Sequence, residues 1–175
     1  MPKIIVLEGV DSTGKSSLAK LFAKELNACY FHASGHKTMH FAMTAHHMSM
    51  LHDIEVNLEQ GRDVVCDRHW MSEIAYASVL RPEQFAWYKK SEIFNRISKL
   101  SPRYVHCCGD IHTCFERYER THADHDRSLF HHLTFDQYKD IAMNYLHLFM
   151  DIPHHVYSIE ENGMRQLELL EKVIA

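Results

Sequence analysis

The chain has 175 residues, of which 46% are hydrophobic and 24% charged, and its formal net charge is −4 with histidine neutral. This length fits a single domain over residues 1–175, and the slightly acidic balance excludes a broad basic surface for polymeric nucleic acid. No apolar run approaches the roughly 20 residues that cross a bilayer, and the first residues reach Glu8 too early for a signal peptide. We therefore expect a cytoplasmic protein with small-molecule partners, neither a membrane protein nor a nucleic-acid binder.

Short apolar, β-branched runs alternate with longer stretches of helical periodicity along the chain. The expected elements are, in order, a strand at 3–7, a helix at 14–27, a strand at 29–33, a helix at 39–60, a strand at 64–66, helices at 72–80 and 82–100, a strand at 104–108, helices at 111–120 and 135–150, a strand at 156–159 and a helix at 164–173. This alternation predicts an α/β fold, a five-stranded parallel sheet with helices on both faces. Ligands of such open sheets bind at the carboxyl ends of the strands.

The segment between the first strand and the first helix fits the phosphate-loop pattern G-x-x-x-x-G-K-[ST], from Gly9 to Ser16. Glycine lets the backbone turn its N–H groups toward phosphate oxygens, and the helix N-terminus adds partial positive charge. Lys15 would hold the β- and γ-phosphates of ATP, and the Ser16 hydroxyl would ligate Mg²⁺. The expected contacts to the ATP phosphates are Gly9, Asp11, Ser12, Thr13, Gly14, Lys15, Ser16 and Ser17.

The third expected strand runs directly into Asp67 and Arg68, at the same edge of the sheet as the phosphate loop. Asp67 would hold Mg²⁺, directly or through water, so that Ser16 and Asp67 form the expected metal site. Arg68 carries a planar guanidinium that can bridge phosphate oxygens bidentately. The alternative is an ordinary ion pair at the end of a strand.

A phosphate loop alone does not separate kinases, GTPases and motor ATPases. No N-K-x-D motif for reading guanine is present, which argues against a GTPase, and 175 residues are too few for the sensor regions of most motor ATPases. A small single-domain kinase remains.

Three segments together resemble the thymidylate kinases, within the wider group of nucleoside and nucleotide kinases. Glu8 to Lys15 is similar to that family's E-G-x-D-x-x-G-K, and Asp67 to Tyr76 is similar to its D-R-Y-x-x-S-x-x-A-Y. Residues 115–127 look like a short lid that carries arginines, and we place this lid near 117–130. The resemblance implies a P-loop kinase fold and transfer of the ATP γ-phosphoryl group to a deoxynucleoside monophosphate, dTMP to dTDP first of all.

The resemblance also assigns roles to individual residues. Arg68 would clamp the acceptor phosphate, Asp11 would lie near the acceptor sugar hydroxyl, and Glu8 would help arrange the magnesium and the loop. The expected acceptor contacts are Glu8, Asp11, Phe41, Arg68, Ser72 and Tyr76. The expected catalytic set is Lys15, Asp67, Arg68, Arg117 and Arg127. The two lid arginines would supply catalytic charge, since the phosphate loop carries no arginine of its own. The alternative for them is a salt-bridged helix face. The family is usually dimeric, so a homodimer is expected.

The chain departs from the family pattern on the acceptor side. Ala33 to Lys37 stand where the family carries R-E-P-G, His46 stands where an arginine is usual, and His69 replaces a tyrosine. Two alternatives therefore stay open. One is a deoxynucleoside kinase that phosphorylates a 5′-hydroxyl, with Glu8 or Asp67 as base. The other is a non-catalytic nucleotide-binding module.

Overall fold

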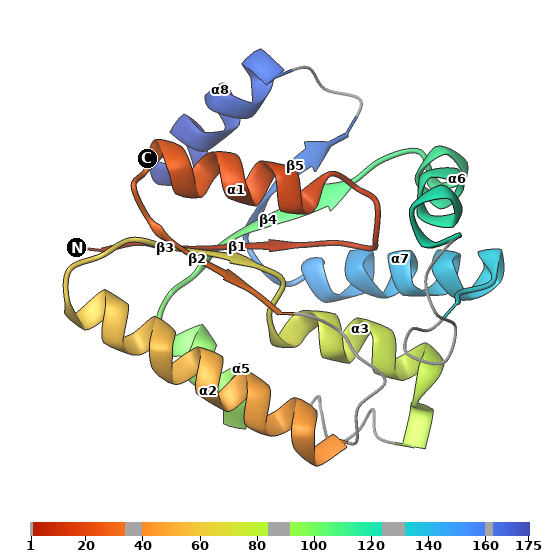
Figure 1. Cartoon of the computed structure of the whole chain (residues 1–175), viewed down its shortest axis with the longest axis horizontal. Helices are drawn as coiled ribbons and strands as arrows, with labels where there is room; N and C mark the ends of the chain where they lie inside the picture. The colour runs from red at the N-terminus through yellow and green to blue at the C-terminus, as the bar shows by residue number, and fades with distance from the viewer. Residues whose placement is uncertain (1, 34–39, 84–91, 124–131, 160–162) are drawn as a thin grey trace.

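The computed structural model describes residues 2–33, 40–83, 92–123, 132–159 and 163–175, with the side chains of 40–43, 163 and 164 left out. Five strands form one sheet in the order β2-β3-β1-β4-β5, and all neighbouring strands are parallel (Figure 1). The strands are β1 (Ile4–Glu8), β2 (Cys29–His32), β3 (Val64–Asp67), β4 (Arg103–Cys108) and β5 (His154–Ser158). The predicted five-stranded parallel sheet is confirmed.

Helices cover both faces of the sheet, as Figure 1 shows. On one face lie α1 (Lys15–Glu25) and α8 (Gly163–Ile174). On the other lie α2 (His40–Glu59), α3 (Trp70–Leu80), α5 (Glu92–Lys99) and α7 (Phe135–Phe149). Because successive strand residues point to opposite faces, the apolar strands fill two separate cores. Leu7 and Val65 pack with α1 and α8, whereas Val6 and Cys66 pack with the helices of the other face.

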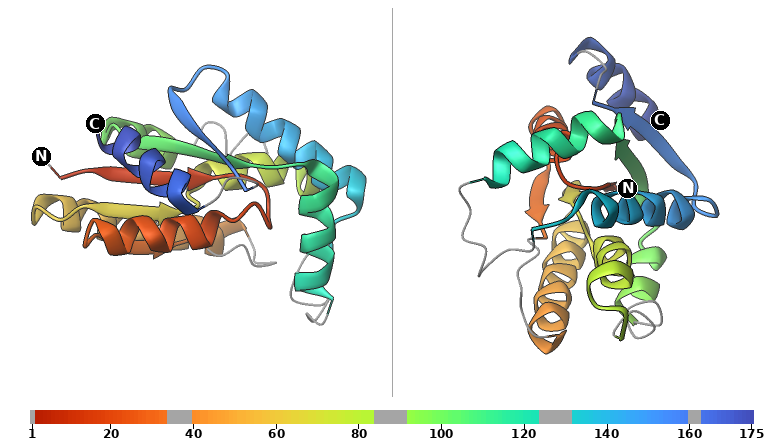
Figure 2. Two further views of the ribbon diagram at one scale, coloured as in Figure 1. Left: turned by 90° about the horizontal axis from the view of Figure 1, so that it is seen from above. Right: turned by 90° about the vertical axis from the view of Figure 1, so that its right-hand side faces the viewer.

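The sheet register brings the polar strand ends together. Leu7 of β1 pairs with Asp67 of β3, and Glu8 pairs with His106 of β4. Helix α6 (Ile111–His122) stands beyond these carboxyl ends, where the chain turns from β1 into α1 (Figure 2). The ends of β1, β3 and β4 and the adjoining helices therefore surround one region.

Several boundaries differ from the sequence predictions, and the sheet explains most of them. β1 and β3 each extend one residue further, to Glu8 and Asp67. β5 begins at His154 rather than at 156, because His154 and His155 pair with β4. The start of α3 at Trp70 is likewise earlier than predicted, since His69 caps it in an extended conformation. Of the helix predicted at 82–100, residues 82 and 83 are helical and α5 begins at Glu92, while residues 84–91 lie outside the described chain.

The lid predicted near 117–130 is only partly covered by the structure. Residues 117–122 form the last turns of α6, and 124–131 lie outside the described residues. Within the segments that are described, none of the helices combines the length and apolar composition that crossing a membrane requires.

Candidate active site

The loop between β1 and α1 is held in a conformation that glycine makes possible. Gly9 and Gly14 have φ of 151° and 77°, and Ser12 between them has φ of 64°. A Cβ on Gly9 would lie 2.1 Å from the carbonyl oxygen of Cys107, so the loop runs against the backbone of β4. The Thr13 hydroxyl donates a hydrogen bond of 2.9 Å to the Val10 carbonyl and braces the turn. This geometry matches the tight phosphate-holding turn that the sequence predicts.

Lys15 opens α1 and is buried, with 4% of its surface exposed. Its Nζ lies 3.5 Å from the Val10 carbonyl oxygen, and no carboxylate of the described chain is in salt-bridge contact with it. Burial lowers the pKa of Lys15, and the nearby charge of Arg68 lowers it further. A buried ammonium without a salt-bridge partner is suited to an incoming phosphate anion.

Asp67 is fully buried at the end of β3. Its Oδ2 accepts hydrogen bonds from Tyr30 (3.0 Å) and from His32 Nδ1 (2.9 Å), both on the neighbouring strand β2. Burial raises the pKa of Asp67, but the His32 hydrogen bond and the Lys15 charge outweigh it and hold the pKa well below its usual range. The carboxylate is therefore ionised at neutral pH.

The second carboxylate oxygen of Asp67, Oδ1, is placed as a metal ligand would be. Oδ1 is buried without a hydrogen-bond partner among the described residues. The Ser16 hydroxyl is one of the groups that lower the Asp67 pKa, so the two predicted metal ligands lie near each other. A buried carboxylate oxygen beside a hydroxyl is the kind of oxygen donor that Mg²⁺ prefers. The residues present fit the Mg²⁺ ion that the phosphate-loop pattern implies.

Arg68 forms the centre of a second cluster, and four of the predicted acceptor contacts meet in it. Its backbone is left-handed, with φ of 70°. Nη2 donates to Asp11 Oδ1 at 2.5 Å and to the Tyr76 hydroxyl at 3.2 Å, while Nη1 donates to Ser72 Oγ at 3.1 Å. Tyr76 in turn donates to Asp11 Oδ2 at 2.7 Å. Ser72 and Tyr76 lie one helical turn apart on α3, so one face of that helix presents both.

Glu8 lies beneath this cluster and is fully buried. Oε1 accepts from the backbone N–H of His69 (2.8 Å), and Oε2 accepts from the Ser72 hydroxyl (2.6 Å). Burial raises the pKa of Glu8 to about 7, although Ser72 and Arg68 partly oppose the rise. Since both oxygens are engaged by the start of α3, Glu8 reaches the predicted acceptor site through Ser72 and His69.

Two tyrosines of α7 belong to the site and were missed in the sequence. The Tyr145 hydroxyl contacts Arg68 Nη1 (3.0 Å), Ser72 Oγ (2.7 Å) and Glu8 Oε2 (3.3 Å). The Tyr138 hydroxyl donates to the backbone carbonyl of Asp11 at 2.5 Å. The two are seven residues apart and therefore face the same way on the helix. The seven-residue spacing of the two tyrosines is the sequence signal that could have indicated them. The same spacing is equally typical of apolar residues that face the core.

The remaining predicted residues do not join either cluster in the part of the chain that is described. Ser17 is exposed on α1, and Arg117 is partly exposed on α6 without a described side-chain contact to the loop. Phe41 lies in α2, but its side chain is outside the described residues. Arg127 lies wholly outside them.

Comparison with known proteins identifies a family and a fold. The family model described as thymidylate kinase matches residues 32–168. A curated relative from Methanocaldococcus jannaschii, described as a probable thymidylate kinase, is 32% identical in an alignment 94 residues long, and the match covers 43% of this chain and 50% of the relative. The match thus spans about half the length of that relative. The matched family segment begins after the phosphate loop, so the loop is an independent observation.

Solved structures agree with the fold. Deoxyadenosine kinase from M. mycoides with bound dCTP superposes with a TM-score of 0.65 at 16% identity, covering 98% of each chain. The YorR protein of Bacillus subtilis, in complex with phosphorylated GDP, gives a TM-score of 0.61 at 16% identity and covers 98% of this chain and 94% of its own. At such identities the likeness concerns the fold alone, and it confirms the P-loop kinase architecture.

Proposed function

The chain belongs to the thymidylate kinase family. From this premise we propose that it transfers the γ-phosphoryl group of ATP to a deoxynucleoside monophosphate, with dTMP as the preferred acceptor. The observation that carries the proposal is that two candidate anion sites lie at one edge of the sheet. One is the phosphate loop with Lys15, and the other is the Arg68 cluster with Asp11, Ser72 and Tyr76.

The donor half of the proposal uses the loop between β1 and α1. Backbone N–H groups and Lys15 would bind the ATP phosphates, and Ser16 with Asp67 Oδ1 would hold Mg²⁺. When bound, the ion neutralises charge on the β- and γ-phosphates. Lys15 would hold the phosphates without first breaking an ion pair, because none of the described carboxylates pairs with it.

The acceptor half uses the Arg68 cluster. An acceptor phosphate would take up the guanidinium that now bonds Asp11, and the carboxylate of Asp11 would then turn to the acceptor sugar hydroxyl. An oxygen of the acceptor phosphate attacks the γ-phosphorus, the bond from the γ-phosphorus to the β–γ bridging oxygen breaks, and ADP leaves. A phosphate oxygen is already a competent nucleophile near neutral pH, so this reaction needs no general base.

A second candidate is a deoxynucleoside kinase, since one structural neighbour is a deoxyadenosine kinase. Attack by a sugar hydroxyl would be helped by an available carboxylate base. In this site Glu8 is engaged by His69 and Ser72, Asp11 is paired with Arg68, and Asp67 is the proposed metal ligand. The arrangement favours an acceptor that brings its own charged nucleophile.

The test is ADP formation by the purified chain with ATP, Mg²⁺ and a panel of acceptors. The panel holds the four common deoxynucleoside monophosphates, dUMP and the corresponding nucleosides. We expect turnover with dTMP and little with thymidine. Turnover of nucleosides but not monophosphates would replace the proposal with the deoxynucleoside kinase. ATP binding without turnover of any acceptor would make the chain a nucleotide-binding module.

The setting of the reaction is part of the proposal. We propose ATP and Mg²⁺ as cofactors, small nucleotides as partners, and a homodimer acting in the cytoplasm. The region near 117–130, with Arg117 and Arg127, is proposed as a lid that brings positive charge to the transferred group.

A further inference from the structure

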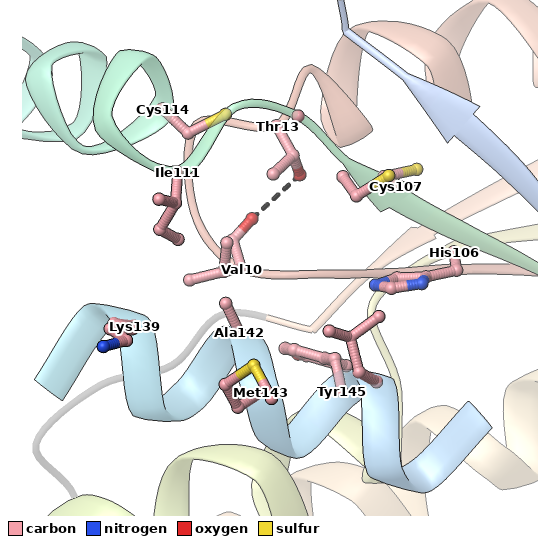
Figure 3. A pocket seen from close by; sticks show the side chains of 13 residues that line it. Val10, Thr13, His106, Cys107, Ile111, Cys114, Lys139, Ala142, Met143 and Tyr145 are labelled. Atoms are coloured by element: carbon pink, nitrogen blue, oxygen red, sulfur yellow. Dashed lines mark hydrogen bonds between the residues drawn. The ribbon is translucent and has the colours of Figure 1, made fainter. Parts of the chain in front are cut away.

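A pocket of about 240 Å³ lies between helix α7, the start of α6 and the carboxyl end of β4 (Figure 3). Val10 of the phosphate loop, Cys107 of β4, Ile111 of α6 and Ala142 and Tyr145 of α7 are among the residues around it. These elements are far apart in the sequence. The pocket shares Val10 and Thr13 with the phosphate loop and Tyr145 with the Arg68 cluster. The nucleotide contacts proposed above are made by the loop backbone, by Lys15 and by the polar side-chain atoms around Arg68.

The wall of the pocket is mostly apolar, and the charged side chain in its lining, Lys139, comes from an exposed position of α7. Two other polar groups, on Thr13 and His106, have roles within the fold. The Thr13 hydroxyl is bonded to the Val10 carbonyl, as the dashed line in Figure 3 marks. Burial lowers the pKa of His106 to about 4, so its ring is neutral, and it stacks on Phe149 at 4.7 Å between centroids. A surface of this kind holds water poorly.

The entrance carries two large apolar side chains that are exposed to solvent. Met143 is 43% exposed and Leu146 is 49% exposed, and both line the pocket. Methionine is flexible and polarisable, so it can adapt to flat ligands of different outline. Protein interiors leave few voids larger than a water molecule, and an engineered apolar cavity of about 150 Å³ takes up benzene. The pocket here is larger and is open to solvent through its entrance.

We propose that this pocket is a binding site for a small uncharged aromatic molecule of one or two rings, and that its occupancy changes acceptor binding through Tyr145. The binding half follows from volume, apolar lining and an entrance made of Met143 and Leu146. It does not depend on the proposed function.

The coupling between the pocket and acceptor binding rests on the proposed function. It follows from the position of Tyr145, which contacts both the pocket and the Arg68 cluster. The side chain lines the pocket, while its hydroxyl contacts Arg68, Ser72 and Glu8. A ligand that shifts the ring therefore changes the hydrogen bonds that hold the Arg68 guanidinium. Because coupling free energies are reciprocal, an acceptor bound at Arg68 must change the ligand's affinity by the same factor.

Binding is tested by titrating the whole chain with indole in a calorimeter. Ala142→Leu fills the pocket from its wall, and Met143→Glu places a charge at its entrance, where the exposed side chain makes the change tolerable for folding. We expect indole to bind the wild type and to bind each variant at least about tenfold more weakly. Ala123→Leu, at the exposed end of α6, is the matched control and should bind indole like the wild type.

Three results would overturn the binding site. The first is no indole binding to the wild type, and the second is binding to both variants as tight as to the wild type. The third is displacement of indole by ATP alone, which would assign the pocket to the donor nucleotide. Far-UV circular dichroism checks that the variants fold. If Ala142→Leu does not fold, the indole affinity of Met143→Glu decides whether the site exists.

Coupling is tested by measuring dTMP affinity with and without saturating indole. We expect a change in the dissociation constant of at least about threefold in the wild type and none in Ala142→Leu. Unchanged dTMP affinity alongside clear indole binding would reject the coupling through Tyr145. If dTMP does not bind at all, the proposed acceptor is wrong and the coupling fails with it, while the indole titration still decides the binding site.

Discussion

Arg68 shows how much of the site depends on single side chains. The residue is 8% exposed, and its charge is balanced by Asp11 and by hydroxyls from two helices. Burying a charge is costly unless hydrogen bonds and an opposite charge compensate, and here both are present. The compensation also orients the guanidinium in advance, which would reduce the ordering cost of binding the proposed acceptor phosphate.

The first prediction concerns this guanidinium. Arg68→Lys keeps the charge but loses the fork that contacts several oxygens at once, so the KM for the acceptor should rise about 10- to 100-fold. The KM for ATP should change much less. Steady-state ADP formation at varied dTMP measures both, with Arg62→Lys on the exposed surface as the control. An unchanged acceptor KM would remove Arg68 from the acceptor site.

Glu8 gives a prediction about pH. Its pKa is raised from 4.5 to about 7 in the folded chain, so the folded state holds a proton that the unfolded state releases. The stabilisation is fully present below pH 4.5 and is lost as the pH rises through 7. Relative to Glu8→Gln, the wild type should lose about 2 to 3 kcal/mol between pH 5 and pH 8.

Urea unfolding of both proteins at the two pH values measures this difference. His69 and His106 have lowered pKa values and the opposite pH dependence, and they cancel because they are present in both proteins. A pH-independent gap between wild type and variant would mean that Glu8 titrates near its ordinary pKa.

The sequence predicted some contacts of the site and not others, for a physical reason. Asp11, Arg68, Ser72 and Tyr76 lie in two short motifs whose spacing on a strand end and a helix turn fixes their direction. Tyr145 meets Glu8 across 137 positions, and Tyr30 meets Asp67 across 37. Such contacts depend on how helices and strands pack, which no local pattern encodes.

At the scale of elements, the phosphate loop packs closely against β4 where the chain leaves β1. Gly9 lies there against the Cys107 carbonyl, whereas Gly61, in the turn between α2 and β3, has open space around its Cα. Both have positive φ, so alanine at either position is strained, but only one meets a backbone atom.

Replacing each glycine by alanine separates the strain of a left-handed backbone from the clash with β4. Gly61→Ala should cost about 1 to 2 kcal/mol from its left-handed backbone alone. Gly9→Ala should cost more than about 4 kcal/mol, because strand β4 must move away from the loop. Chemical denaturation compares the two. Similar losses would show that β4 yields easily and that the loop is not rigidly seated on it.

Element types were predicted more reliably than element ends. All five strands were predicted because their runs are short and apolar, as burial on both faces requires. β5 was predicted too short because His154 and His155 look polar, although their backbones pair with β4. The sequence prediction starts α3 two residues late. Trp70 and Met71 are adjacent apolar residues that point in different directions, so no helical periodicity marks the start of the helix.

For the whole molecule, Lys15→Ala separates catalysis from folding. Its ammonium is buried without an ion pair among the described residues, so its removal should leave thermal stability unchanged or slightly higher. The turnover number should fall about 100- to 1,000-fold, since a charge aimed at the transferred group is lost. A thermal melt and a turnover assay on one preparation test both halves. Retained turnover would mean that the donor phosphates bind elsewhere.

The whole chain belongs to a known family, but its candidate site departs from the family pattern on the acceptor side. The family match covers residues 32–168, and the phosphate loop lies before it. The phosphate loop, the proposed metal ligands and Arg68 stand where the family pattern expects them, whereas Ala33 to Lys37, His46 and His69 depart from it. The single-domain organisation and the lid near 117–130 stay predictions.

The measurement that tests the central claim most directly is phosphorus NMR of ATP and dTMP mixed with the purified chain and Mg²⁺. The account predicts that the β-phosphate signals of ADP and of dTDP appear together and in equal amounts while the γ-phosphate signal of ATP declines. Formation of ADP with inorganic phosphate and no dTDP, or an unchanged spectrum, would contradict it.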